Sequence, residues 1–346
     1  MGEHMHIELP VLPTTLVGSY PKPVWLKALS RGLKFHENRK RAKLLKEAHD
    51  DAVTIVVREL EELGIDIPTD GKVRRDPGIE YFAKKVDGFK FYGPVRVWNN
   101  HYTMKPAIID RLRYEGPIVV DEYLYLRNVA KAKVVKVTIT GPVTVADWSF
   151  NEYYRSKEEL LFDLAKIINA ELKKLEEAGA LYVQIDEPSL LVRPEDVELG
   201  VEAINEAVRG LSIKVGLHVC YSNYTLLKPY FDELRVSQLT LEFASRGFKD
   251  LELLEGLNKE LGLGVIDVHS SYIEDPSTIA RAIRKAMKYV KPECIYVNPD
   301  CGMKFLSRDV AREKLKSMVD GVRMVREELG RKGLESIEFR VRDTCP

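Results

Sequence analysis

His218 and Cys220 stand two residues apart in the stretch "HVCY", directly after an apolar run. Side chains alternate between two faces in an extended segment, so this imidazole and this thiol share one side. Three readings of such a pair are open at this point. It is a buried structural pair, a redox thiol beside a base, or half of a metal site, and residues elsewhere in the chain decide among them.

Two further candidate ligands, Glu242 and Cys301, each follow another apolar run. Two thiolates, an imidazole and a carboxylate form a mixed set that suits tetrahedral Zn²⁺. No CxxC pair is present, so this is not a short zinc ribbon, and its members assemble only on folding. We therefore predict a metal site made of His218, Cys220, Glu242 and Cys301. From spacing alone, the alternative that each is an ordinary buried side chain stays open.

The other two cysteines are expected to be unpaired. Cys294 lies within an apolar run, which is typical of a small buried hydrophobe, and Cys345 lies where a terminus frays. Four cysteines in 346 residues are too few for a disulfide framework, which favours a reducing cytoplasm. A cysteine-nucleophile hydrolase is disfavoured, because a base two residues along the same strand face is poorly oriented to share a proton with the thiol.

The composition excludes several classes of function. Hydrophobic residues make up 45% of the chain and the 53 basic and 53 acidic side chains cancel, which is typical of a globular protein without a nucleic-acid-binding surface. No apolar run approaches the roughly 20 residues needed to cross a bilayer. The start, "MGEHMHIELP", lacks the apolar region of a signal peptide. We therefore expect no nucleic-acid or membrane partner.

Short apolar runs alternate with long amphipathic helical patterns, which is typical of parallel βα units. Eight runs are apolar nearly throughout, as strands buried on both faces are. These predicted strands span residues 14–19, 64–70, 134–140, 181–186, 213–219, 238–242, 263–268 and 294–299. Eight such units predict an α/β fold, specifically a (β/α)8 TIM barrel, formed by residues 1–346 as one domain.

Two local patterns refine this prediction. A helix over 156–180 opens at Ser156 with Glu159 three residues on, the pattern of a capping box.

The segment at about 71–133, after the second predicted strand, is too long for an ordinary connection. We interpret it as an excursion that contains a hairpin over 86–98, turning at Tyr92-Gly93. Long insertions in barrels commonly shape the mouth of the active site.

Polar and metal-binding side chains gather where the predicted strands end. These residues are Ser19, Asp70, Thr140, Asp186, His218, Cys220, Glu242, His269, Asp300 and Cys301. In a barrel the carboxyl ends of the strands meet on one face, where the active site lies. The gathering favours metal binding or proton transfer over a set of unrelated buried residues.

Several long motifs occur in the order that one enzyme family has them. They are "TTLVGSYP", "TGPVTVADWSF", "QIDEPSL", "HVCYSNY", "LEFASRG", "IDVHSSYI" and "VNPDCGMK". The chain resembles the cobalamin-independent (vitamin-B12-independent) methionine synthase family, specifically its C-terminal catalytic barrel in a short, archaeal-type form. The resemblance spans nearly the whole sequence.

The resemblance implies a methyltransferase that holds Zn²⁺ through His218, Cys220, Glu242 and Cys301. In that family a methyl group is transferred to the thiol of homocysteine to give methionine, with the zinc-bound thiolate as nucleophile. The chemistry is reasonable, because coordination deprotonates a thiol that is otherwise mostly protonated at neutral pH. Glu242 is the expected exchangeable ligand.

Further roles carry over from the family's motifs. Ser19 in "VGS" would bind the substrate carboxylate, and Asp186 in "QIDEP" would bind the substrate ammonium. His269 in "DVHS" would be the catalytic proton donor to the leaving group. Trp148 in "DWSF" lies where the family stacks its folate. Without the resemblance, Asp186 would be interpreted as a turn residue and Trp148 as packing.

The chain departs from the family in the parts that would bind the methyl donor. The family's usual members carry an additional N-terminal barrel that helps hold a polyglutamylated folate, and no segment here matches it. An acid that contacts the pterin is replaced by Val192 in "DEPSLLV". These departures favour methylcobalamin or a corrinoid protein as donor, with methyl-folate as the alternative. They also raise the expectation of a partner chain that supplies the N-terminal half.

The match breaks again in "TDGKVRRDPGIEYF", where Lys72 stands at the position of a family glutamate that reaches the homocysteine ammonium. A lysine cannot accept a hydrogen bond from an ammonium group, and the two charges repel. Asp70 takes over, or Lys72 points away or contacts the carboxylate, or the substrate differs. We favour replacement by another acid.

Two alternative functions stay open beside the homocysteine methyltransferase. One is a zinc-dependent methyltransferase that acts on another thiol. The other is a non-catalytic barrel subunit of a methyltransferase complex, which Lys72 favours. The retained ligand set, with Asp186 and His269, favours an enzyme.

Overall fold

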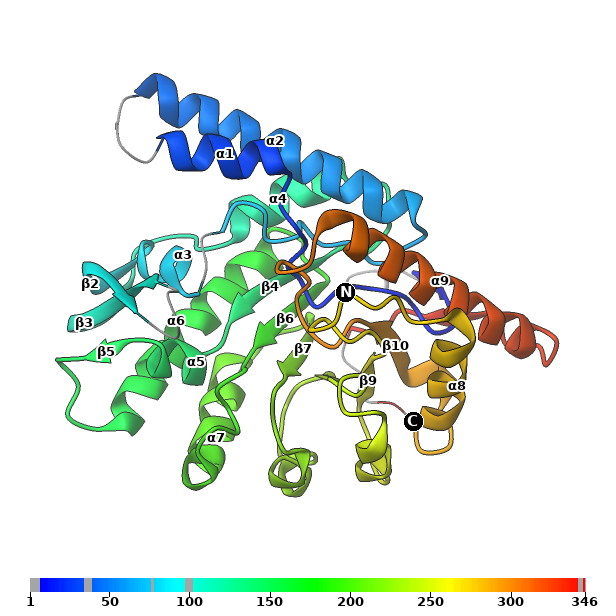
Figure 1. Cartoon of the computed structure of the whole chain (residues 1–346). Coiled ribbons are helices and arrows are strands. Elements are labelled where there is room, and N and C mark those ends of the chain that lie inside the picture. The colour runs from blue at the N-terminus through cyan, green and yellow to red at the C-terminus, as the bar shows by residue number, and fades with distance from the viewer. Residues whose placement is uncertain (1–6, 34–38, 76–77, 97–101, 342–344, 346) are drawn as a thin grey trace. The chain divides into compact units, whose positions relative to one another are not determined.

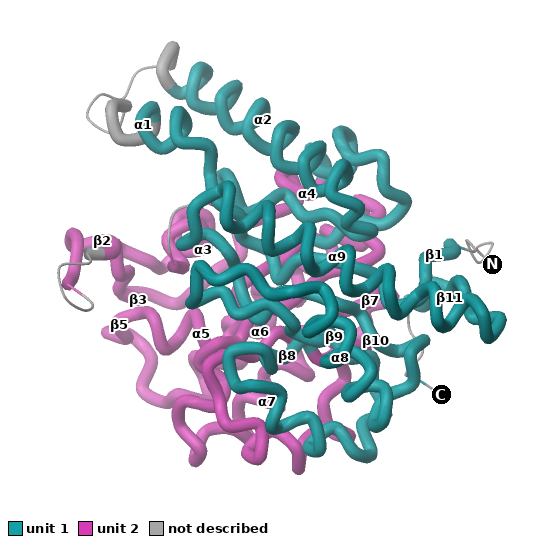
Figure 2. Tube along the Cα trace, turned by 45° about the vertical axis from the view of Figure 1, so that its right-hand side comes forward, with its two compact units in different colours: residues 1–74, 124–136, 240–346 teal, residues 75–123, 137–239 magenta. Residues whose placement is uncertain are grey.

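The computed structural model describes residues 7–33, 39–75, 78–96, 102–341 and 345 (Figure 1). The chain divides into two compact units (Figure 2). Unit 1 consists of residues 1–74, 124–136 and 240–346, and unit 2 consists of residues 75–123 and 137–239.

The largest sheet has six strands in the order β10-β9-β8-β7-β6-β4. Its strands are β4 (Lys136–Thr140), β6 (Tyr182–Asp186), β7 (Lys214–Val219), β8 (Gln238–Leu241), β9 (Glu260–Gly264) and β10 (Ile295–Asn298). Every residue of these strands is buried. The pairs β6–β7 and β9–β10 are parallel. The prediction of an α/β fold with a parallel sheet is confirmed.

Five predicted strands coincide with observed ones, whereas the other three differ. Residues 14–19 and 64–70 supply parallel bridges, Thr14 to Val297 and Thr15 to Ile67, rather than full strands. The strand predicted at 263–268 is β9, which begins earlier, at Glu260. Val265 and Ile266 are buried in the segment that follows β9. The apolar residues there are buried although they lie outside the paired strand, which is why the sequence pattern placed the strand too late.

The helices include the long amphipathic ones that the sequence predicts. They are α1 (Val24–Leu33), α2 (Arg39–Glu62), α3 (Glu80–Ala83), α4 (Val120–Val129), α5 (Pro142–Asp147), α6 (Lys157–Glu177), α7 (Val197–Ala207), α8 (Pro276–Ala286) and α9 (Arg308–Gly330). The capping box is confirmed, because the Ser156 hydroxyl accepts the Glu159 N–H at 3.0 Å. No helix in the described ranges is long and apolar enough to cross a membrane.

Unit 2 also contains a sheet in the order β2-β3-β5. Its strands are β2 (Val86–Arg96), β3 (Tyr102–Tyr114) and β5 (Phe150–Asn151). The predicted turn at Tyr92-Gly93 is wrong, since both residues lie within β2. The pairing with β3 shifts register between Phe91 and Pro94, so this pair of residues forms an irregularity in a longer strand. The sequence signal was a glycine, which marks bulges as well as turns.

Unit 1 contains a small antiparallel sheet of β1 (Glu8–Pro10) and β11 (Ser336–Glu338). Near it, the prediction of two unpaired cysteines is wrong. Cys294 and Cys345 form a disulfide with their Cα atoms 5.8 Å apart. Cys294 is buried, as predicted, but burial alone did not reveal that a residue 51 positions later returns to it.

Candidate metal and substrate site

His218 is the fifth residue of β7, and Cys220 directly follows the strand. Both side chains are 2% exposed. The register of the β6–β7 pair sets Asp186 opposite His218, and the Glu187 N–H donates to the His218 carbonyl at 2.8 Å. Gln184 Nε2 fixes the Asp186 carboxylate with a 2.7 Å hydrogen bond. One predicted metal ligand and one predicted substrate-binding acid therefore lie on neighbouring strands.

A tight turn after β7 holds Cys220. Tyr221 adopts a left-handed backbone conformation with φ of 55°, which is uncommon for a residue with a side chain. The Ser222 hydroxyl donates to the Cys220 carbonyl at 2.8 Å, and the Tyr224 hydroxyl donates to the Val219 carbonyl at 2.9 Å. These bonds fix the backbone on both sides of the thiol.

The Asp300 carboxylate links the ends of β8 and β10 within unit 1. It accepts the N–H groups of Phe243 at 3.1 Å, Ala244 at 3.0 Å and Ser245 at 2.7 Å. These donors directly follow Glu242, and Asp300 directly precedes Cys301. Gly264 leaves room for this contact, since a Cβ there would meet Asp300 Oδ1 at 2.4 Å. Asp300 thus holds two predicted ligands in fixed segments.

Three of the four predicted metal ligands are brought together. One ligand atom each from His218, Cys220 and Cys301 lies within 4.8 Å of the others. Neither of these two cysteines forms a disulfide. Glu242 is not a member of this group, although it follows β8 directly and is only 3% exposed. The described residues therefore contain a candidate His/Cys metal site, whose donor atoms are those that Zn²⁺ prefers.

Ser19 lies in a loop packed on the segment after β10. The Met303 N–H donates to the Ser19 carbonyl at 2.8 Å. A Cβ at Gly302 would come within 2.0 Å of the Ser19 hydroxyl oxygen. Glycine is required there because the two segments approach so closely.

His269 and Trp148 are the most exposed of the predicted site residues. The His269 side chain is exposed, and its backbone N–H donates to Asp267 at 2.8 Å. Trp148 ends α5 and is 39% exposed. Both side chains are accessible to a ligand.

Glu187 is a positioning residue that the sequence did not single out. Its carboxylate accepts hydrogen bonds from the Val143 N–H and from the N–H and hydroxyl of Thr144, at 2.7 to 2.9 Å. It therefore binds the first turn of α5, the helix that ends at Trp148. Burial raises its pKa to about 7, although these three donors oppose the shift. In the sequence, Glu187 looks like an exposed acid beside a proline.

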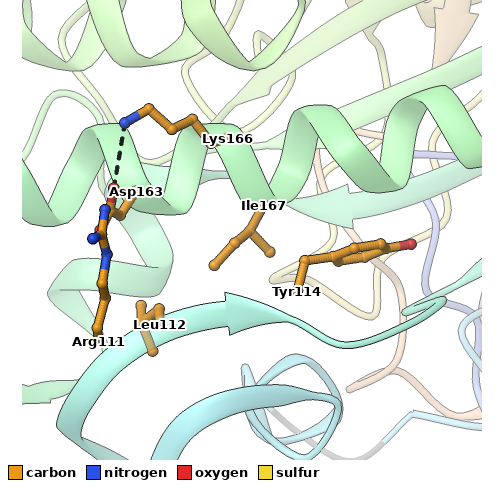
Figure 3. Close-up of a pocket in the computed structure, with 6 residues that line it drawn as sticks. All are labelled: Arg111, Leu112, Tyr114, Asp163, Lys166 and Ile167. Atoms are coloured by element: carbon orange, nitrogen blue, oxygen red, sulfur yellow. Dashed lines mark hydrogen bonds and ion pairs between the residues drawn. The ribbon is translucent and has the colours of Figure 1, made fainter.

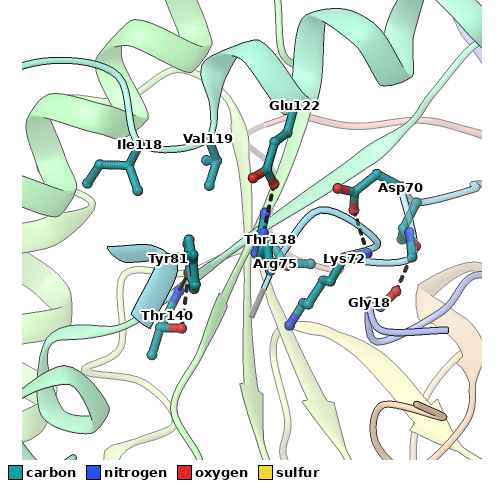
Figure 4. A network of polar contacts seen from close by, with 12 residues as sticks. Gly18, Asp70, Lys72, Arg75, Tyr81, Ile118, Val119, Glu122, Thr138 and Thr140 are labelled. Carbon is teal, nitrogen blue, oxygen red and sulfur yellow. Dashed lines mark hydrogen bonds and ion pairs between the residues drawn. The ribbon is translucent and has the colours of Figure 1, made fainter. Parts of the chain in front are cut away.

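A buried polar network fixes the carboxyl half of β4 within unit 2 (Figure 4). Arg75 Nε donates to Glu122 at 2.7 Å, and its guanidinium donates to the Thr138 hydroxyl at 3.2 Å. The same guanidinium lies 4.6 Å from the centre of the Tyr81 ring. Tyr81 in turn shares a 3.1 Å hydrogen bond with the hydroxyl of Thr140. The network is structural support that the sequence gives no sign of.

A shallow pocket between β3 and α6 has no evident catalytic role (Figure 3). It is lined by Arg111, Leu112, Tyr114, Asp163, Lys166 and Ile167. Both cations are paired with the Asp163 carboxylate, at 3.2 Å from Arg111 and 3.4 Å from Lys166. We therefore assign no function to it.

Comparison with known proteins identifies the family of the chain. Residues 12–323 match the family described as the catalytic domain of cobalamin-independent synthase. A methionine synthase of Pyrococcus horikoshii is 54% identical over 339 residues, which are 96% of this chain and 98% of that protein. One of Saccharolobus solfataricus is 50% identical over 329 residues, which are 94% and 98% of the two chains.

A solved structure extends the comparison. A B12-independent methionine synthase from Shewanella sp. W3-18-1, in complex with selenomethionine, has a TM-score of 0.83 and 27% identity, covering 93% of this chain and 99% of that one. The fold and these matches define the protein as a methyltransferase. The chain belongs to the cobalamin-independent methionine synthase family.

Proposed function

We propose that this chain is a zinc-dependent methyltransferase that transfers a methyl group to the thiol of homocysteine and so forms methionine. The observation that carries the proposal is the group of His218, Cys220 and Cys301, whose ligand atoms lie within 4.8 Å of one another, in a chain of this family. Two sulfurs and an imidazole are a donor set for Zn²⁺ rather than for Mg²⁺ or Ca²⁺. Glu242 is our candidate for the fourth, exchangeable ligand.

When bound, zinc supplies the Lewis acidity that lowers the pKa of a thiol ligand. The chain's own residues position the rest of the substrate. We assign the substrate carboxylate to Ser19 and the ammonium to Asp186, whose carboxylate is already oriented by Gln184. We assign the proton for the leaving group to His269, because its exposed imidazole can exchange protons with solvent. Trp148 would provide a flat surface for the methyl donor.

We propose further that residues 1–346 form one closed (β/α)8 barrel, with the excursion at about 71–133. The six-stranded sheet ends at β10 and β4. Parallel bridges join Val297 of β10 to Thr14, and Thr15 to Ile67. The Lys136 N–H at the start of β4 donates to the Pro68 carbonyl at 3.0 Å. These contacts support residues 14–15 and 67–68 as the two further strand positions of the proposed barrel.

We infer that the methyl donor is methylcobalamin or a corrinoid protein rather than methyl-folate. The support is the replacement of a family acid by Val192, which is 61% exposed and offers no hydrogen bond to a pterin. A partner chain that carries the donor belongs to this proposal, as does a cytoplasmic location. Equal turnover with methyl-folate and with methylcobalamin would contradict the choice of donor.

The test of the function is metal analysis together with X-ray absorption at the zinc edge. Purified enzyme should contain close to one zinc, and homocysteine should add one sulfur to the first coordination shell. Homoserine, which has a hydroxyl in place of the thiol, is the matched control and should leave the sulfur count unchanged. A zinc-free active enzyme, or an unchanged first shell with homocysteine, would contradict the proposal.

A further inference from the structure

Asp70 has a buried carboxylate oxygen that accepts no hydrogen bond from the described residues. The residue is 3% exposed. Its Oδ1 accepts the Lys72 N–H at 3.0 Å, whereas no described hydrogen-bond donor reaches Oδ2. An unsatisfied buried carboxylate oxygen is costly unless a cation or donor binds it. The feature therefore points to a ligand with a positive charge.

The register within unit 1 sets Asp70 beside Ser19. Thr15 bridges Ile67 in parallel, so three residues further along each segment Gly18 and Asp70 lie at the same level. Two hydrogen bonds maintain this alignment, from the Thr69 hydroxyl to the Gly18 carbonyl and from the Tyr20 N–H to the Gly71 carbonyl, each at 3.0 Å. The residue proposed to hold the substrate carboxylate thus neighbours Asp70.

The segment that contains Ser19 also pairs with β10, which leads to Cys301 of the candidate metal site. Thr14 bridges Val297 in parallel, so the two segments run in the same direction toward Ser19 and Cys301. The hydrogen bond from the Met303 N–H to the Ser19 carbonyl, 2.8 Å long, joins these segments directly. Ser19, Asp70 and Cys301 therefore stand on three adjacent segments of one unit. An α-amino acid that presents its thiol near Cys301 and its carboxylate to Ser19 has its ammonium group next to Asp70.

Lys72 does not neutralise Asp70 with its own side chain. Its backbone is left-handed, with φ of 51°, and its N–H, not its ammonium group, donates to the carboxylate. In Figure 4 the side chain extends away from Asp70. Burial, and then the charge of Lys72, lower the pKa of Lys304.

We propose that Asp70 is a second acid for the α-ammonium group of the amino-acid substrate, in addition to Asp186, and that it binds this group through its buried Oδ2, beside the carboxylate site at Ser19. Asp70 would take the role of the glutamate that the family carries at position 72. This inference rests on the proposed function and names a further substrate-binding residue for it. A charge-assisted contact of this kind is specific for substrates that carry an ammonium group.

The experiment compares homocysteine with 4-mercaptobutanoate, which has the same thiol and carboxylate but no ammonium group. Wild-type kcat/KM should favour homocysteine by roughly 30- to 1,000-fold, as expected for a buried charge pair. Asp70→Asn keeps the Oδ1 acceptor for the Lys72 N–H and should lose most of that preference. Its kcat/KM for 4-mercaptobutanoate should change by less than about threefold, because the contact with the ammonium is absent there.

The double variant Asp70→Asn/Lys72→Glu is the matched control. It returns a carboxylate to the family's position and should recover preference for homocysteine. If Asp70→Asn retains the wild-type preference, Asp70 does not bind the ammonium. If the Asp70→Asn variant loses the preference for homocysteine but also loses zinc or thermal stability, Asp70 has a structural role and the assignment is wrong. A wild-type enzyme that methylates neither thiol would overturn the proposed function itself, a result distinct from these two.

Discussion

At the amino end of β10, Cys294 is bonded to Cys345, whereas Cys301, beyond its carboxyl end, is not part of a disulfide. The two cysteines are seven positions apart. Cys294 closes a covalent loop in unit 1. Cys301 offers its sulfur to a group that includes His218 and Cys220. The same residue type thus has a structural role at one end of the strand, and at the other end it belongs to the candidate metal site.

The largest effect is expected from Cys301→Ser. Loss of a thiolate ligand should reduce zinc content and lower kcat/KM by more than about 100-fold. The melting temperature should change little, because the buried strands form the core. Metal analysis and a methionine-forming assay measure both effects. Cys294→Ser is the matched control at the other end of β10 and should keep zinc and turnover. Full activity of Cys301→Ser would remove it from the site.

His269→Ala tests a residue beyond the carboxyl end of a strand that we propose as a proton donor and not as a metal ligand. We expect unchanged zinc content and a loss of about 100-fold in kcat at neutral pH, the range for removal of a general acid. Stopped-flow measurement of methyl transfer checks this, with zinc analysis as the control. An unchanged rate would exclude His269 from the mechanism.

Removal of the disulfide should affect stability alone. The loop that it closes spans 51 residues, so Cys294→Ser with Cys345→Ser should lower the free energy of unfolding by about 2–4 kcal/mol. Urea unfolding with and without reductant measures the change, and kcat/KM should stay at the wild-type value. A loss of zinc in this variant would contradict the expectation that the disulfide at the amino end of β10 has no role in the metal site beyond its carboxyl end.

The smallest effect concerns Asp50 on α2. Its burial disfavours the charged form, but hydrogen bonds from Lys46 and Arg74 outweigh this and hold the pKa of Asp50 below its ordinary value. A carboxylate with a depressed pKa stabilises the fold at neutral pH, and that contribution is lost as the pH falls through the folded-state pKa. Asp50→Asn should therefore cost about 0.5–1 kcal/mol at neutral pH and less in acid.

Urea unfolding at several pH values measures this difference. Asp87→Asn is the control, because Asp87 and its partner Arg113 are each about half exposed and their pair should contribute little. Equal destabilisation of Asp50→Asn at acid and neutral pH would contradict an electrostatic origin.

The sequence predicted the parts of this molecule that local pattern controls. Apolar runs located β6 and β7, and the capping box at Ser156 located the start of α6. The closeness of His218, Cys220 and Cys301 was predictable because the family's motifs carry these residues at or beyond strand ends, whereas their role as metal ligands stays a prediction. Long-range pairings were not predictable, since nothing near Cys294 indicates a return of the chain at Cys345. The roles of Asp300 and Glu187 likewise depend on backbone donors that no motif encodes.

The pairing of β1 with β11 has a consequence for biosynthesis. Glu8 aligns with Glu338, so a segment made first has its partner made 330 residues later. At ribosomal rates of about 5–20 residues per second, that interval is roughly 15 to 70 s. Throughout it, Leu9, which is buried in the finished protein, has no β11 to pair with. The amino-terminal strand of the nascent chain therefore acquires its partner only when translation is almost complete.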